Sequence, residues 1–189
     1  MPLCAKDRED VVEAGDSLPG FCRAETLVMG CGNPLLGDDG FGPEVISHLR
    51  DHCRIPDEVL LLDAGTGISR LLFDIVLAPR KPRRLIVVDA MRRGLPAGTV
   101  SALALESVRL EEGRTFAEHQ EPTSCLLKEL RDMGGIEVTL LVAEPEFMPP
   151  EVSPGLSPAM REAVIKAVDC IATRLLTKAL QPSIRIHKP

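Results

Sequence analysis

Short apolar runs alternate with segments of helical periodicity along most of this chain. The runs have the length and composition of buried strands, and they lie at 25–30, 59–63, 84–90 and 138–143, with an added strand expected at 98–105. Apolar residues three and four positions apart predict helices at 43–53, 68–76, 125–133 and 158–176. Ser157 and Pro158 form a helix-start signal for the last of these. The order predicts a single three-layer α/β/α domain, with a mostly parallel twisted sheet of about five strands and helices on both faces.

The chain is about the size of one globular domain. Its 189 residues are 44% hydrophobic, which is enough to bury a sizeable core. Residues 1–24 combine a charged cluster with a glycine- and proline-containing turn and have little periodicity. We therefore expect an N-terminal arm at 1–24, the domain at 25–180 and a C-terminal tail at 181–189.

Charge and composition exclude several classes of protein. A net charge of −6 and the absence of Trp and Tyr disfavour binding to nucleic acid. No stretch approaches the roughly 20 apolar residues that cross a bilayer, and residues 1–24 are acidic where a signal peptide is basic and then apolar. The six cysteines follow no regular spacing, which favours reduced thiols over a disulfide framework or zinc site. We expect a cytoplasmic protein without membrane or nucleic-acid partners.

A glycine-rich segment, 30–42, connects the first expected strand to the first expected helix and contains the adjacent carboxylates Asp38 and Asp39. Both carboxylates could simply cap the helix, because acids near a helix N-terminus accept its free amide protons. One cap does not need two acids, however, and adjacent like charges are costly without a cation. We expect Asp38 to be structural and Asp39 to be a ligand.

Acidic residues also end the next two expected strands. Asp63 and Asp89 should meet Asp39 at the carboxyl edge of the sheet, where α/β folds bind ligands, although Asp63 could equally cap the following helix. His119 lies in an expected loop just before a helix. Two carboxylates and one imidazole would suit nickel, zinc, iron or manganese. A second pair, His48 and His52, lacks a metalloprotease pattern and predicts a solvated helix face.

The glycines have a second interpretation. Gly30 and Gly32 after a strand resemble the start of a dinucleotide-binding motif, with Asp63 placed to receive a ribose hydroxyl. The third glycine position is occupied by Leu35, and Asp38 and Asp39 put negative charge where a pyrophosphate would bind. This interpretation is therefore disfavoured but kept as an alternative.

Six motifs in order resemble the signature of the nickel-iron hydrogenase maturation endopeptidases. The first is the glycine-rich segment 30–42, which is similar to the family pattern Gly-x-Gly-Asn followed by two apolar residues and Asp-Asp/Glu. The others resemble the family's Asp-Gly-Gly-Thr, its third-strand acid, Pro-Gly-Thr, His-Gln and Gly-Leu-Ser/Thr-Pro, and they are found here at 63–66, 88–90, 96–99, 119–120 and 155–158. Within the family, segments 31–35 and 37–45 look most like the branch that serves the deazaflavin-reducing hydrogenases of methanogens.

The resemblance implies an endopeptidase that removes a C-terminal extension from a hydrogenase large-subunit precursor once nickel is in place. By position, the catalytic and metal-contacting residues would be Asp39, Asp89 and His119, and the nickel would be held by the substrate. Substrate-binding candidates are Asp38, Asp63, Thr66, Gly67 and Gln120. The group that activates water stays open, and we expect no nucleophilic role for Cys31 or Cys125.

Two other functions stay open beside the protease. The absence of a recognisable nucleophile or base is compatible with a nickel-dependent binding chaperone for the large subunit, without peptidase activity. The two early glycines leave a dinucleotide-binding oxidoreductase as the weaker alternative. The sequence also departs from the family at 121–124, which replaces a more apolar run, and at Asp39, where many members have Glu.

Overall fold

The computed structural model describes residues 20–105 and 121–175. Its strands are β1 (Thr26–Cys31), β2 (Val59–Gly65), β3 (Arg84–Ala90), β4 (Val100–Ala104) and β5 (Glu137–Ala143). Its α-helices are α1 (Phe41–His52), α2 (Ile68–Leu77), α3 (Glu121–Asp132) and α4 (Pro158–Cys170). Short 3₁₀ turns occupy Gly20–Cys22 and Gly37–Gly40, and a π-helical turn, Ile171–Leu175, extends α4.

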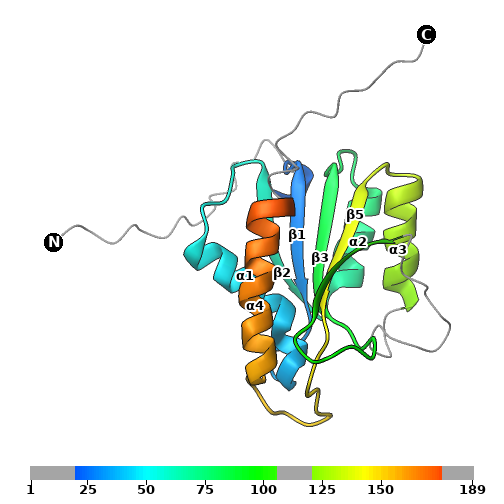
Figure 1. Ribbon diagram of the computed structural model, residues 1–189. Helices are drawn as coiled ribbons and strands as arrows, with labels where there is room; N and C mark the ends of the chain where they lie inside the picture. The colour runs from blue at the N-terminus through cyan, green and yellow to red at the C-terminus, as the bar shows by residue number, and fades with distance from the viewer. Residues whose placement is uncertain (1–19, 106–120, 176–189) are drawn as a thin grey trace.

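The five strands form one sheet in the order β2-β1-β3-β5-β4. All neighbours are parallel except β4, which runs antiparallel to β5. The parallel strands therefore all end at one edge of the sheet, which is the lower edge in Figure 1 and is called the C-terminal edge below. The predicted α/β sheet of about five strands is confirmed, and the added strand is the antiparallel one.

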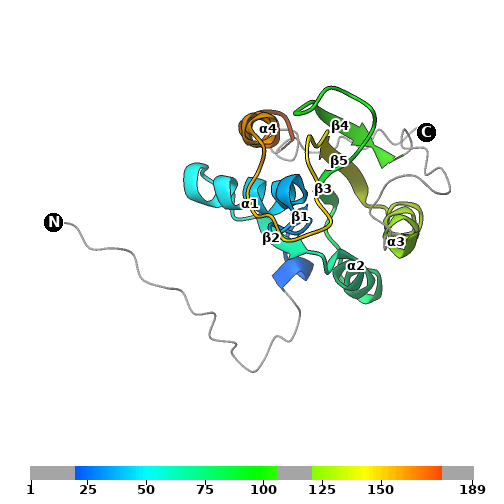
Figure 2. The same cartoon turned by 90° about the horizontal axis from the view of Figure 1, so that it is seen from below.

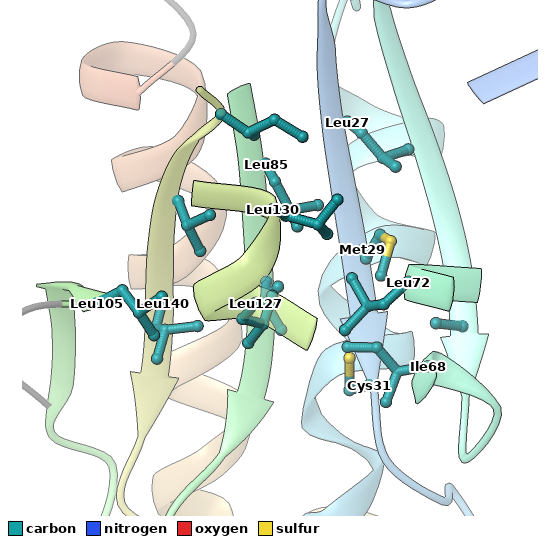
Figure 3. Packing of buried hydrophobic residues seen from close by; sticks show 14 of the residues in the cluster. Leu27, Met29, Cys31, Ile68, Leu72, Leu85, Leu105, Leu127, Leu130 and Leu140 are labelled. Atoms are coloured by element: carbon teal, nitrogen blue, oxygen red, sulfur yellow. The ribbon is translucent and has the colours of Figure 1, made fainter. Parts of the chain in front are cut away.

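Helices cover both faces of the sheet, and alternating strand residues supply the two cores. Figure 2 shows α1 and α4 on one side and α2 and α3 on the other. Leu85 and Val87 of β3 pack with the α2/α3 side, whereas Ile86 and Val88 pack with the α1/α4 side. Figure 3 shows the α2/α3 core, in which Cys31 lies beside Ile68 and Leu72. The predicted three layers are thus present.

Helix α1 lies unusually close to β1 and β3 because two glycines face each other. A Cβ on Gly30 would lie 2.4 Å from the carbonyl oxygen of Gly42. A Cβ on Gly42 would lie 2.3 Å from the oxygen of Cys31 and 2.5 Å from that of Val88. The helix begins at Phe41, two residues before the predicted start at Pro43, because the 3₁₀ turn Gly37–Gly40 leads directly into it.

The other predicted elements agree with the structure to within a few residues, except at the start of α3. That helix begins at Glu121 and not at Cys125. Ser157 caps α4, its hydroxyl accepting the amide of Met160 at 3.3 Å, with Pro158 as the first helical residue. The first 19 residues of the expected arm and the whole expected tail lie outside the described residues. None of the helices in the described ranges has the length and apolarity to cross a bilayer.

Candidate active site

Carboxylates from three segments meet at the C-terminal edge. Asp63 is near the end of β2 and Asp89 near the end of β3, and β1 lies between these two strands. Asp39 lies in the loop that follows β1. The negative charges of Asp39, Asp63 and Asp89 all act on the thiol of Cys31, the last residue of β1. The sequence-based expectation that these acids share one edge is therefore met by the strand order.

Asp39 is held by the glycine-rich loop itself. Its Oδ2 accepts a hydrogen bond from the backbone amide of Asn33 at 2.7 Å. Gly32, with φ of +119°, brings the backbone so close that a Cβ there would overlap the carbonyl oxygen of Asp39. Partial burial raises the pKa of the Asp39 carboxyl, and the Asn33 hydrogen bond opposes that rise. One carboxylate oxygen is therefore fixed by backbone, in a half-buried position.

Asp89 is almost completely buried, with 6% of its surface exposed. It follows Leu85 and Val87 in the strand alternation, which places it on the α2/α3 side of the sheet. Burial, and then the negative charge of Asp39, raise its pKa to about 7, against a hydrogen bond at 2.8 Å from the amide of Ala90. In the described ranges, no Lys or Arg forms an ion pair with Asp39 or Asp89. The carboxylates of Asp39 and Asp89 form the centre of this site.

Cys31 is not suited to act as a nucleophile. It is 1% exposed, and burial, followed by the charges of Asp89, Asp63 and Asp39, holds the pKa of its thiol well above the usual value. The thiol therefore stays protonated and packs as a small apolar side chain beside Ile68 and Leu72 (Figure 3). Cys125 is exposed on α3 as a free thiol.

Asp38 joins the glycine-rich loop to the loop between β5 and α4. The residue is fully buried. Its Oδ2 accepts the backbone amides of Glu146 at 2.8 Å and Phe147 at 2.7 Å, and its Oδ1 accepts that of Ser157 at 2.7 Å. These bonds support the structural role expected for Asp38. With no exposed surface left for a peptide, Asp38 is not kept among the substrate-binding candidates.

Three acids that could have capped helices, Asp38, Asp39 and Asp63, do not do so. The N-cap of α1 is Gly40 and that of α2 is Gly67, and neither position has a side-chain cap. The capping interpretation of Asp38, Asp39 and Asp63 is therefore wrong. Asp63 is exposed, and its Oδ1 instead accepts the amide of Gly65 at 3.0 Å at the end of β2. Thr66 and Gly67 are exposed in the turn that follows this strand, open to a ligand.

His119 and Gln120, the remaining predicted site residues, lie outside the described residues. The chain is described again from Glu121, at the start of α3. Thr123 in the first turn of that helix is 1% exposed, and its hydroxyl lies 2.6 Å from that of Ser69 in α2. This pair connects the first turns of the two helices that cover the Asp89 side of the sheet.

Glu144 is a fourth carboxylate at this edge and is not among the site residues predicted from the sequence. It directly follows β5 and is 7% exposed. Its oxygens accept the backbone amides of Arg93 at 2.7 Å and Gly94 at 3.2 Å, which fixes the loop between β3 and β4. The rule that identified Asp63 and Asp89, an acid after an apolar strand, applies to Glu144 as well.

The donor set suits a divalent cation only in part. Within the described ranges, no group of three His, Cys, Asp or Glu residues could hold a metal ion. Asp39 and Asp89 supply two carboxylates, so a third ligand has to come from elsewhere, either His119 or a substrate. The histidine pair His48 and His52 lies on α1. The Nε2 atom of His48 is 3.7 Å from Oε1 of Glu44, and the ring centroids of His48 and His52 are 5.2 Å apart.

Comparisons with known proteins converge on one family. Residues 43–174 match the family model HycI, described as hydrogenase maturation protease. A Methanocaldococcus jannaschii protein named as a hydrogenase maturation protease is 36% identical over 150 residues, 79% of this chain and 95% of its own. The coenzyme F420 hydrogenase subunit delta of Methanothermobacter thermautotrophicus is 36% identical over 152 residues, 78% and 92% of the two chains. The structure of the hydrogenase-maturating endopeptidase HybD from Escherichia coli superposes with a TM-score of 0.65 at 28% identity, covering 82% of this chain and 93% of that one.

Proposed function

This chain belongs to the family of hydrogenase maturation endopeptidases, and on that premise we propose that it recognises the nickel of a large-subunit precursor through Asp39, Asp89 and His119. Members of the family cleave the C-terminus of the hydrogenase large subunit and depend on nickel. The precursor presents its nickel as part of the substrate. Removal of the C-terminal extension follows once that metal is seated at the C-terminal edge.

The coupling of Asp39 to Asp89 is the observation that carries this proposal. Burial, and then the negative charge of Asp39, raise the pKa of Asp89 to about 7, so the two carboxylates lie close together in a poorly solvated region. A divalent cation reverses this situation, because it stabilises both ionised carboxylates and displaces the proton. The site is therefore better suited to a metal-bearing client than to an anionic ligand such as a pyrophosphate.

The position of Thr123 supports His119 as the third ligand. Thr123 contacts Ser69 in the first turn of α2, the helix that follows β2 and its residue Asp63. His119 precedes Thr123 by four residues, and four residues of extended chain span no more than about 14 Å. Helix α3 also covers the side of the sheet on which Asp89 lies. The start of α3 on the Asp89 side of the sheet therefore supports the assignment of His119 as the third ligand.

The nickel supplies Lewis acidity towards the scissile carbonyl. The chain's own residues then have three tasks. Asp39 and Asp89 provide oxygen ligands whose positions are set by the Asn33 and Ala90 amides. The exposed residues Asp63, Thr66 and Gly67 bind the extension, together with Gln120. The residue that activates water is not assigned.

The client that we propose is a coenzyme-reducing hydrogenase of the methanogen type. Two methanogen proteins each match more than three quarters of this chain at 36% identity. The precursor used in a test should accordingly come from a coenzyme-reducing hydrogenase.

Incubation with nickel-loaded and nickel-free precursors tests the proposal. Mass spectrometry should show loss of a C-terminal peptide from the loaded precursor only. Equal shortening of the nickel-free precursor would contradict recognition through nickel. Capture of the loaded precursor without release of a peptide would instead favour a binding chaperone.

A further inference from the structure

Three large apolar side chains are exposed on the two loops that Asp38 joins. Leu35, Phe147 and Val152 have 50%, 53% and 71% of their surfaces exposed. Leu35 belongs to the glycine-rich loop, and the other two belong to the loop between β5 and α4. We call these three residues the apolar rim.

Backbone hydrogen bonds hold the two loops of the apolar rim together. Leu36 and Ser153 form a parallel bridge, with the Ser153 amide donating to Leu35 at 2.8 Å and the Gly37 amide donating to Ser153 at 2.9 Å. The Asp38 amide donates to the carbonyl of Phe147 at 2.9 Å, and the buried Asp38 carboxylate accepts the Phe147 amide. The rim is thus fixed in place before any partner arrives.

The apolar rim is continuous with the proposed metal-recognition site. The Asn33 amide donates to the Asp39 carboxylate, and the Asn33 side-chain oxygen accepts the amide of Leu35 at 3.0 Å. Asn33 therefore connects the backbone of Leu35 to the carboxylate of Asp39. Exposed apolar side chains next to a site that acts on a protein are typical of an interface.

The charges around the rim indicate what kind of segment it binds. Segments 33–37 and 146–153 contain two acidic residues, Glu146 and Glu151, and no Lys or Arg. Both acidic residues are exposed. An apolar segment with basic residues on its flanks complements this surface in shape and in sign.

We propose that the apolar rim docks the large-subunit precursor, through an apolar segment of the precursor flanked by Lys or Arg. This inference rests on the function proposed above and adds the surface that selects the client. The apolar rim supplies affinity through burial of Leu35, Phe147 and Val152, while the carboxylates of the proposed site bind the metal. A precursor can then be bound before its nickel is seated.

Matched variants on two surfaces test this docking. Phe147→Ser combined with Val152→Ser removes most of the rim. Phe73→Ser combined with Leu77→Ser is the control, because these α2 side chains are 52% and 66% exposed. Leu77 is the last residue of α2, and its neighbour Val76 lines a cavity of about 240 Å³ with Lys81 and the C-terminal end of α3. Equal melting temperatures of both variants and the wild type would establish that each is folded.

Biolayer interferometry measures the affinity of each variant for the full-length precursor, in its nickel-loaded and its nickel-free form. The rim variant should bind about tenfold more weakly, and the control should stay within twofold of the wild type. Rim affinity within twofold of the wild type, or an equal loss in the control, would overturn the proposal. Binding is read separately from cleavage, so a wild type that binds at the rim without shortening the precursor would refute the protease function alone.

The charge component is tested with Glu146→Gln combined with Glu151→Gln. This variant should bind about threefold more weakly than the wild type at low salt and should lose part of the wild type's salt dependence. Affinity that is the same with and without these carboxylates at low salt would contradict a basic flank on the client.

Discussion

The carboxylate of Asp38 accepts the backbone amide of Ser157 at 2.7 Å, although 119 residues separate the two in the chain. With the amides of Glu146 and Phe147, this bond connects the loop that contains Asp39 to the loop that precedes α4. The position of Asp39 therefore depends on a buried neighbour that never contacts a substrate.

Asp38→Ala should lower the free energy of unfolding by about 3 kcal/mol, because three backbone amides lose their acceptor in a buried place. Urea denaturation measures this change. Asp74→Ala, an exposed carboxylate on α2, is the control and should change the free energy by less than about 0.5 kcal/mol. A similar small effect for Asp38→Ala would show that this residue does not hold the loops together.

Gly42→Ala should destabilise the protein by more than about 2 kcal/mol or prevent folding, because the added Cβ would meet backbone atoms of Cys31 and Val88 at 2.3 to 2.5 Å. Backbone atoms cannot move aside as a flexible side chain can. Gly20→Ala is the control, since nothing lies within 4 Å of a Cβ at that position. Thermal melting compares the two, and equal melting temperatures would contradict the close approach of α1 to β1.

The pKa of Asp89 makes the stability of the metal-free protein depend on pH. The folded pKa of about 7 exceeds the usual value of about 4 for Asp, so the folded state binds the proton more tightly than the unfolded state. The stabilisation is complete below pH about 4 and is lost as the pH rises towards 7. Relative to Asp89→Asn, the wild type should lose several kcal/mol of stability over this range.

Urea denaturation between pH 4 and pH 8 measures this difference, with Asp74→Asn as the control for an exposed carboxylate. A difference in the free energy of unfolding between the wild type and Asp89→Asn that stays constant with pH would mean that Asp89 titrates normally in the folded protein.

The Ser69 and Thr123 hydroxyls should stabilise each other by about 1 kcal/mol in a double-mutant cycle. The variants are Ser69→Ala, Thr123→Val and their combination, and the free energy of unfolding is the quantity compared. Thr123 is buried, so its hydroxyl has to find a partner within the protein. Additive effects of the two substitutions would show that the short contact contributes nothing.

The fold could be predicted from the sequence because each strand is marked by a local run of apolar residues. Each apolar run, such as Leu85–Val88, is long enough to identify a buried strand, and the alternation with helices favours a parallel sheet. Acids after two of these runs, Asp63 and Asp89, could then be assigned to one edge. The strand order β2-β1-β3 bears this out.

The details of the site were less accessible because they depend on distant backbone. A carboxylate near a helix start usually caps it, so capping was a reasonable interpretation of Asp38 and Asp63. Nothing in the sequence indicates that the Asp38 carboxylate would instead accept hydrogen bonds from the amides of Glu146 and Ser157. Glu144 was not predicted as a site residue. It directly follows β5, much as Asp89 lies near the end of β3. The Ser69–Thr123 pair joins two helices whose relative position the sequence does not specify.

Processing of nickel-loaded precursor by single variants at Asp39, Asp89 and His119 tests the central claim most directly. Asp39→Ala, Asp89→Ala and His119→Ala should each leave the precursor at full length in the mass spectrum, because each removes one ligand for the substrate's nickel. His48→Ala and Asp74→Ala, matched residues on exposed helix faces, should shorten it as the wild type does. Normal processing by Asp39→Ala or by His119→Ala would contradict the claim that these side chains recognise the metal.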